Sequence, residues 1–114
     1  MEGKLVVERK ESSRSNQNVL SLRGPVTLET VSVFQDAVRA ASAPALILDL
    51  SEVPYVDSSA LGAFVQAYVS CQKSNRKLAL VGLNHRVRGL LQISSLDLLF
   101  VTFPTVAEAE QALA

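Results

Sequence analysis

Apolar positions along the chain follow two alternating patterns. Short runs of aliphatic and β-branched residues, typical of strands, lie at 4–8, 19–22, 45–50, 77–81 and 98–101. Between them, apolar residues recur every three or four positions, as on one face of a helix, at 28–42, 59–74, 84–94 and 105–113. The predicted order is strand, strand, helix, strand, helix, strand, helix, strand, helix.

This alternation predicts the fold class. Strands that alternate with helices imply right-handed crossovers and a largely parallel sheet, with the first two strands as an antiparallel hairpin. The nearly unbroken apolar run at 45–50 is typical of a strand covered on both faces, whereas residues 9–18 lack apolar side chains and predict a long hairpin loop. We therefore predict a single α/β domain over residues 1–114, a mixed, mostly parallel β-sheet of about five strands with about four helices.

Polar residues mark the predicted helix starts. Thr27 is the predicted N-cap of the first helix, and Glu29 would lie in its first turn, where a negative charge suits the helix dipole. Asn84 is the predicted cap of the third helix. Thr105 and Glu108 form a capping box for the fourth.

The second predicted helix has two different sides. Its apolar face holds Leu61, Phe64, Val65, Tyr68 and Val69. The other side holds small or polar residues, namely Ser59, Gly62, Ala63, Gln66, Ala67 and Ser70. Such a shallow surface suits docking by another protein, but small residues also let a helix pack closely on its own sheet. Both interpretations stay open.

Composition excludes several classes of partner. The chain has 114 residues, 48% of them hydrophobic, and 11 basic against 11 acidic side chains, so it lacks the charge bias of a nucleic-acid or membrane surface. Its single cysteine, Cys71, cannot form an internal disulfide. Residues 1–4 do not open a signal peptide, and no apolar run approaches the ~20 residues of a membrane span. We expect a cytoplasmic protein without membrane insertion.

Catalytic and cofactor motifs are missing from the sequence. A single histidine, His85, rules out a histidine-pair metal motif, and the G-x-S-x-G pattern of serine hydrolases does not occur. Neither a Walker A nor a G-x-G-x-x-G loop is present. We interpret Cys71 as a packing residue. The sequence predicts neither an enzyme nor a cofactor.

The stretch YVDSSALGAF, residues 55–64, places Asp57, Ser58 and Ser59 at a helix start that follows a strand. Functional groups are common at this edge of α/β sheets, and free N–H groups with the helix dipole attract anions there. On these residues alone, Asp57 or Ser58 could be a simple helix cap, or Ser58 could be a regulated site.

The segment LILDLSEVPYVDSSALGAF, residues 46–64, resembles the signature of STAS domains, most closely that of bacterial anti-sigma factor antagonists. The likeness continues in K-L-A-L-V-G after the second helix and H-R-V-R-G-L-L before the last strand. This resemblance implies a STAS-like fold and a protein-interaction module. It implies phosphorylation of Ser58 by a partner that is both anti-sigma factor and serine kinase, loss of binding on phosphorylation, and reversal by a PP2C-type phosphatase.

The resemblance also implies which residues meet the partner: Asp57, Ser58, Ser59, Ala60, Gly62 and Thr27. Asp57 would orient the serine, and Gly62 would keep its side of the helix bare. Two positions depart from the family pattern, because Ala60 stands where glycine is usual and Thr27 where relatives commonly have aspartate.

Other functions remain as alternatives. A constitutive STAS subunit of a membrane lipid-transport ABC assembly would use Ser58 as an interface residue or a cap, without phosphorylation. A nucleotide sensor and a hydrolase acting through Ser58 are weaker alternatives, because no motif in the sequence supports either one.

Overall fold

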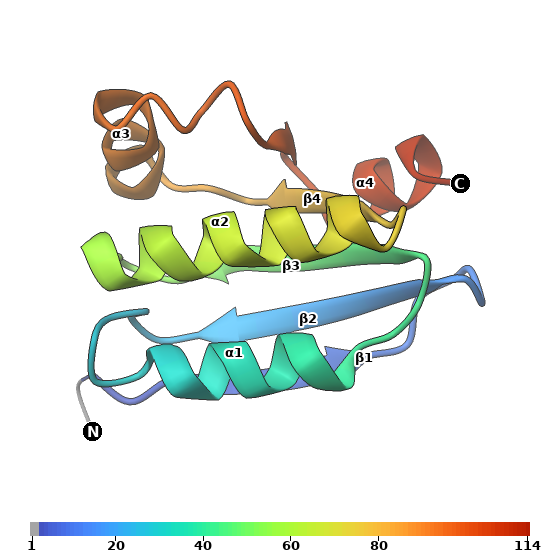
Figure 1. Ribbon diagram of the computed structural model, residues 1–114, viewed down its shortest axis with the longest axis horizontal. Coiled ribbons are helices and arrows are strands. Elements are labelled where there is room, and N and C mark those ends of the chain that lie inside the picture. Colours follow the sequence, from blue (N-terminus) through green and yellow to red (C-terminus); the bar gives the residue numbers. More distant parts are fainter. Residues whose placement is uncertain (1–2) are drawn as a thin grey trace.

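The computed structural model describes residues 3–114, where the chain forms a five-stranded sheet and four helices (Figure 1). In chain order the elements are β1 (Val6–Lys10), β2 (Gln17–Arg23), α1 (Val31–Ala40), β3 (Ala45–Glu52), α2 (Ser58–Lys73), β4 (Lys77–Val81), α3 (His85–Ile93), β5 (Val101–Phe103) and α4 (Val106–Ala112). The predicted element order and fold class are confirmed. The expectation about a signal peptide falls partly on residues 1 and 2, which lie outside the described residues.

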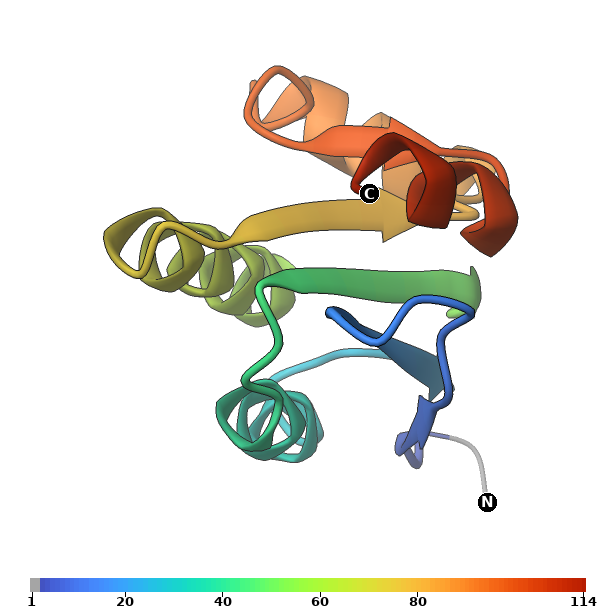
Figure 2. The ribbon, with the colours of Figure 1, turned by 90° about the vertical axis from the view of Figure 1, so that its right-hand side faces the viewer.

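The sheet has the strand order β1-β2-β3-β4-β5, in which β1 is antiparallel to β2 and the remaining pairs are parallel. Each crossover advances by one strand in the same direction, so right-handed connections place their helices on one face. Figure 2 shows α1 and α2 on one side of the sheet and α4 on the other. The carboxyl ends of β2, β3 and β4, and the starts of α1, α2 and α3, therefore meet at one edge, on the left in Figure 1.

β3 is covered on both faces, as its apolar run predicts. Leu46 and Leu48 lie in the larger core beneath α1 and α2, whereas Ala45 and Ile47 lie in the smaller core beneath α4, with Ala109. All four β3 side chains are essentially inaccessible to water. The strand that leads to Asp57, Ser58 and Ser59, which we call the DSS motif, is thus anchored in the core on both of its faces.

One aromatic pair joins α1 to α2. The buried rings of Phe34 and Phe64 pack edge to face, with ring centroids 5.2 Å apart and planes at 78°. This geometry suits the quadrupoles of two aromatic rings and contributes beyond simple burial. It holds the two helices that border the candidate site.

Several predicted boundaries were wrong at strands. The hairpin loop is shorter than expected because Arg9 and Lys10 pair with Leu20 and Val19 of β2. An edge strand is held by backbone hydrogen bonds and does not need apolar side chains along its whole length. The apolar pattern therefore did not reveal the polar end of β1. The last strand lies at Val101–Phe103 instead of 98–101, because pairing with β4 begins only at Val101.

The first helix begins at Val31, not at 28, and its N-cap is Thr30, not Thr27. The Thr27 N–H donates to the Thr30 hydroxyl at 2.9 Å, and the Thr27 carbonyl accepts from the N–H groups of Thr30 and Val31. Residues 28–30 thus form a turn before the helix, and Glu29 lies outside the first helical turn. In contrast, the predicted caps Asn84 and Thr105 are confirmed, since their side chains accept from Val87 and Glu108.

The buried face of α2 also differs from the predicted face. Leu61 and Phe64 are buried, but Val65 and Tyr68 are half-buried and Val69 is 41% exposed. The fully buried side includes the small residues Ala60, Ala63, Ala67 and Cys71. Small side chains let α2 lie close to its neighbours, so close packing accounts for Ala63 and Ala67.

A polar contact ties the opening hairpin to the last helix. The Glu110 carboxylate accepts from the Ser12 hydroxyl at 2.6 Å and from the Ser13 N–H at 3.0 Å. The Gln17 side chain donates to the Glu110 carbonyl at 2.9 Å. The Ser12 hydrogen bond, followed by that from Ser13, holds the pKa of Glu110 below its usual range.

Glu110→Gln should lower the free energy of unfolding at pH 7 by about 0.5–1 kcal/mol, because an amide oxygen accepts more weakly than a carboxylate and solvent screens this partly exposed site. The folded-state pKa is lowered, so this contribution is present above the unfolded-state pKa and is lost as the pH falls through the folded-state pKa. Urea unfolding across acidic pH should show a shallower pH dependence for the variant. Glu29→Gln, at an exposed position in the turn before α1, is the matched control; equal effects of both substitutions would contradict the role of Glu110.

Gly24 makes a tight turn directly after β2. Its φ is +114°, and a Cβ there would lie 2.0 Å from the Lys4 carbonyl oxygen. Its N–H donates to the Glu52 carbonyl at 3.0 Å. This turn directs the chain into the loop beside the DSS motif.

Gly24→Ala should lower the free energy of unfolding by about 3 kcal/mol, through backbone strain and a steric clash. Gly89→Ala in α3, where a Cβ meets nothing within 4 Å, should raise it by about 0.5–1 kcal/mol through helix propensity. Urea unfolding followed by circular dichroism measures both. Wild-type stability of Gly24→Ala would show that the turn tolerates a side chain.

Candidate functional site

The segment between β3 and α2, which carries the DSS motif, is held from both sides. On one side, Val26 forms an isolated parallel bridge with Val56. On the other, the Asn84 side chain donates to the carbonyls of Val53 and Pro54, each at 3.1 Å. Three loops that are far apart in the sequence therefore form one rigid surface at the carboxyl edge of the sheet.

Asp57 is the centre of this surface. One oxygen, Oδ1, accepts from the N–H groups of Ser59 at 2.9 Å and Ala60 at 3.2 Å, which makes Asp57 the N-cap of α2. The other oxygen, Oδ2, accepts from the Leu28 N–H at 3.0 Å. The Asp57 N–H in turn donates to the Val26 carbonyl at 3.2 Å. The same carboxylate thus caps α2 and binds the loop between β2 and α1.

Ser58 is the first residue of α2, and its side chain is exposed. Among the residues that the structure describes, its hydroxyl forms no hydrogen bond. Because Asp57 supplies the cap, the alternative in which Ser58 caps the helix does not apply. The Ser58 hydroxyl is therefore accessible at the positive end of a 16-residue helix.

An exposed row runs along α2 from this hydroxyl. Ser58, Gly62, Gln66 and Ser70 lie four residues apart, so they stack on one side of the helix, and all are exposed. A Cβ at Gly62 would meet nothing within 4 Å, so the space above it is open. We call these four residues the α2 row.

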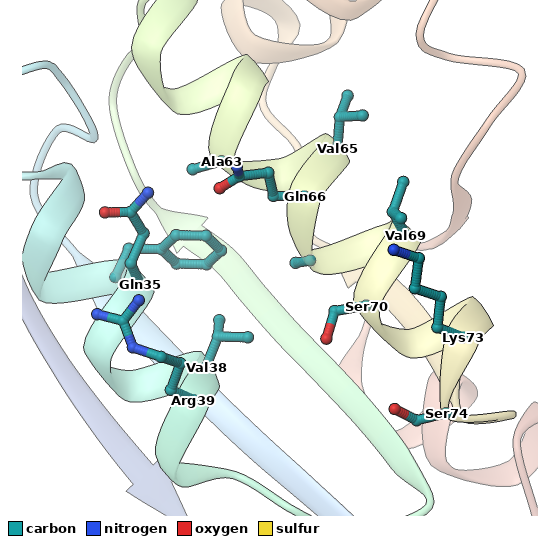
Figure 3. A pocket seen from close by; sticks show the side chains of 12 residues that line it. Gln35, Val38, Arg39, Ala63, Val65, Gln66, Val69, Ser70, Lys73 and Ser74 are labelled. Carbon is teal, nitrogen blue, oxygen red and sulfur yellow. The ribbon is translucent and has the colours of Figure 1, made fainter.

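A groove of about 560 Å³ separates α1 from α2 (Figure 3). The buried side chains of Phe34, Ala63 and Ala67 line it. Ala63 and Ala67, which the sequence placed with the possible docking residues, therefore face α1 and the core. Their small size explains the closeness of the two helices.

The remaining predicted site residues, Ser59, Ala60 and Thr27, differ in how far they are exposed. Ser59 is half-buried, and its N–H is taken up by the Asp57 cap. Ala60 is 0% exposed, so its side chain lies in the core and cannot contact a partner directly. Thr27 is half-buried and lies in the loop that Asp57 binds, with its own N–H on Thr30.

Two exposed apolar side chains near Asp57 were not identified from the sequence pattern. Leu28, whose N–H binds Asp57, is 74% exposed, although its spacing had assigned it to the buried face of a helix. Tyr55 is 36% exposed, and the Arg86 guanidinium lies 5.0 Å from its ring centroid. Neither could be identified before the loops were placed beside each other, because the relevant contacts are between distant segments.

Other chemistry near α2 is limited. Cys71 is buried, and burial raises the pKa of its thiol, which keeps it protonated and unreactive. No helix within residues 3–114 is long and apolar enough to cross a membrane. The accessible features are the free hydroxyl of Ser58, the α2 row and the neighbouring loop.

Comparison of the sequence with known families and proteins identifies a matching family and related proteins. The family model of the STAS domain matches residues 9–109. The anti-sigma-B factor antagonist of Listeria monocytogenes is 42% identical over 52 residues, which cover 46% of this chain and 46% of that relative. The match thus spans about half the length of the relative.

Solved structures share the fold. An anti-sigma factor antagonist from Mycobacterium paratuberculosis superposes with a TM-score of 0.85 at 24% identity, covering 96% of this chain and 93% of that one. The Bacillus cell fate determinant SpoIIAA in its phosphorylated form superposes with a TM-score of 0.73 at 17% identity, covering 96% of this chain and 100% of that one. With the family model matching residues 9–109 and the same arrangement of strands and helices, this chain belongs to the STAS domain family.

Proposed function

We propose that this chain is an anti-sigma factor antagonist that binds an anti-sigma factor with serine kinase activity and is switched off by phosphorylation at Ser58. The observation that carries the proposal is the state of Ser58: exposed, free of the helix cap, and at one end of the exposed α2 row. The Listeria relatives bear the name anti-sigma-B factor antagonist, and SpoIIAA has been solved in a phosphorylated form. Both facts support a regulated binding role rather than catalysis.

The electrostatics of such a switch are sufficient without refolding. A phosphate adds about −1.5 to −2 charges at neutral pH. Two charges ~6 Å from one partner carboxylate repel it by about 1.4 kcal/mol in water and by about 5 kcal/mol at an effective dielectric near 20. These two repulsion energies would weaken binding of the partner by roughly tenfold and by several-thousandfold, respectively.

The domain itself tolerates the added charge. Ser58 lies at the start of α2, where the helix dipole favours negative groups. The Asp57 cap uses neighbouring N–H groups and does not involve the Ser58 hydroxyl. Phosphorylation therefore changes the surface while the fold stays intact, and a PP2C-type phosphatase in the same cytoplasmic setting would reverse it.

The α2 row is the surface that would meet the anti-sigma factor. Gly62 has no side chain, and the space above it is open, so a partner can approach the helix backbone closely. Its neighbours Gln66 and Ser70 are polar and exposed, as in the rim of a reversible interface. Close approach beside Ser58 is what makes a single phosphate effective.

Fragment mass spectrometry of the protein isolated from its native cells should find one added phosphate, located at Ser58. Ser58→Ala should carry none and should unfold like the wild type, because the exposed hydroxyl makes no hydrogen bond within the described residues. Ser59→Ala, the adjacent control, should still be phosphorylated. Absence of phosphate under all growth and stress conditions would sink the switch and favour constitutive docking in a membrane lipid-transport assembly.

Gly62→Gln should weaken binding of the anti-sigma factor at least tenfold, since a long side chain would occupy the open space above α2. Gly89→Gln in α3, where a Cβ also meets open space, is the matched control and should bind normally. Both variants should keep their thermal stability or gain slightly, because glycine is a poor helix former.

The measurement is co-purification from native cells, with the partner identified by mass spectrometry and its affinity for the purified variants determined by calorimetry. Equal affinity of Gly62→Gln and wild type would show that α2 is not the contact surface.

A further inference from the structure

The loop between β2 and α1 presents one large apolar side chain to solvent. Leu28 is 74% exposed, whereas Val26 and Thr30, which flank it in the same loop, are 0% and 7% exposed. Single exposed leucines are common on protein surfaces and carry no argument by themselves. The conformation of this loop and its connection to Ser58 distinguish Leu28.

Consecutive N–H groups hold the loop in place. Val26 donates to the Tyr55 carbonyl at 3.3 Å, Thr27 to the Thr30 hydroxyl at 2.9 Å, and Leu28 to Asp57 Oδ2 at 3.0 Å. The Thr30 hydroxyl in turn donates to the Pro25 carbonyl at 2.9 Å. The backbone that carries Leu28 is therefore already ordered, so binding through Leu28 loses little conformational entropy.

Asp57 connects this loop to the switch serine. Its two oxygens bind Leu28 on one side and the first turn of α2 on the other. Ser58 directly follows Asp57 in the chain, so the apolar side chain and the phosphorylatable hydroxyl belong to one rigid unit. A partner that meets Ser58 closely enough to sense a phosphate also meets this loop.

We propose that Leu28 is a hydrophobic anchor of the partner interface and that Asp57 is the positioning residue that holds it beside Ser58. The proposal rests on the proposed function and names the partner's chemistry: a protein surface with an apolar pocket for Leu28 next to an acidic group that faces Ser58. Anchors of this kind, buried at the centre of an interface, supply a large share of its affinity. The anchor gives affinity, and the adjacent serine gives control.

Photo-crosslinking in native cells tests the anchor. A benzophenone amino acid is introduced at position 28, at position 66 in the α2 row, or at position 98. Leu98 is the matched control because it is a leucine with 90% exposure. We expect positions 28 and 66 to capture the same protein, identified by mass spectrometry, and position 98 not to capture it.

The outcomes separate the two proposals. Capture of one protein from position 66 but not from 28 would overturn the anchor and leave the proposed function standing. Absence of adducts from both positions would overturn the proposed function and the anchor with it. With the captured partner purified, Leu28→Ala should weaken binding about 10- to 100-fold, as expected for losing a buried leucine, and Leu98→Ala should not.

The positioning role of Asp57 has two readouts of its own. In Asp57→Ala, the Leu28 amide should exchange hydrogen at least tenfold faster, while amides of the buried β3 keep their protection. In a double-mutant cycle on partner affinity, Leu28→Ala and Asp57→Ala should be non-additive, because fixing the backbone at position 28 no longer helps binding once the leucine side chain is removed. Unchanged protection of the Leu28 amide, or strict additivity, would show that Asp57 acts only as a helix cap.

Discussion

The Asp57 carboxylate is the interaction on which the candidate site depends. It satisfies two N–H groups at the start of α2 and one in the loop before α1, three donors that a helix end and a loop would otherwise leave to water. An N-cap alone contributes about 1 kcal/mol. The added bond to Leu28 makes a local cap into a contact between segments 29 residues apart. Without this bond, the hydrogen bonds that remain between the two loops are those of the Val26–Val56 bridge and its neighbouring backbone groups, within residues 3–114.

The sheet makes this arrangement possible. Parallel strands in sequential order bring the ends of β2, β3 and β4 to one edge, so their loops are neighbours however far apart they lie in the sequence. Because β3 is buried on both faces, the core fixes the position from which the DSS motif begins. Asn84 then supports the same segment from the opposite side. The position of the site therefore depends on packing in the core, away from the surface.

The fold was predictable from periodicity because the central strands are nearly continuously apolar and the helices carry apolar residues every three or four positions. The element boundaries were less so, and the errors have one physical origin. Arg9 and Lys10 belong to β1 through backbone pairing, and residues 28–30 form a turn through hydrogen bonds to Thr27 and Asp57. Backbone contacts between segments leave no trace in side-chain patterning. For the same reason, the DSS motif could be located in the sequence, but the exposure of Leu28 and the burial of Ala60 could not.

The division of labour between Asp57 and Ser58 bears directly on whether a switch can operate here. If the serine hydroxyl capped α2, a phosphate on it would turn inward to accept from the N–H groups of the first turn, and part of the added charge would be neutralised by the helix itself. The cap is instead supplied by the preceding residue, and the serine hydroxyl projects into solvent from the first turn. A phosphate there meets repulsion from the Asp57 carboxylate, but the helix dipole and the N–H groups already bound to that carboxylate offset it. The charge of such a phosphate would then face a protein that approaches the α2 row. A helix start with the cap one residue before an exposed serine would thus allow a charge switch at that serine without loss of the cap.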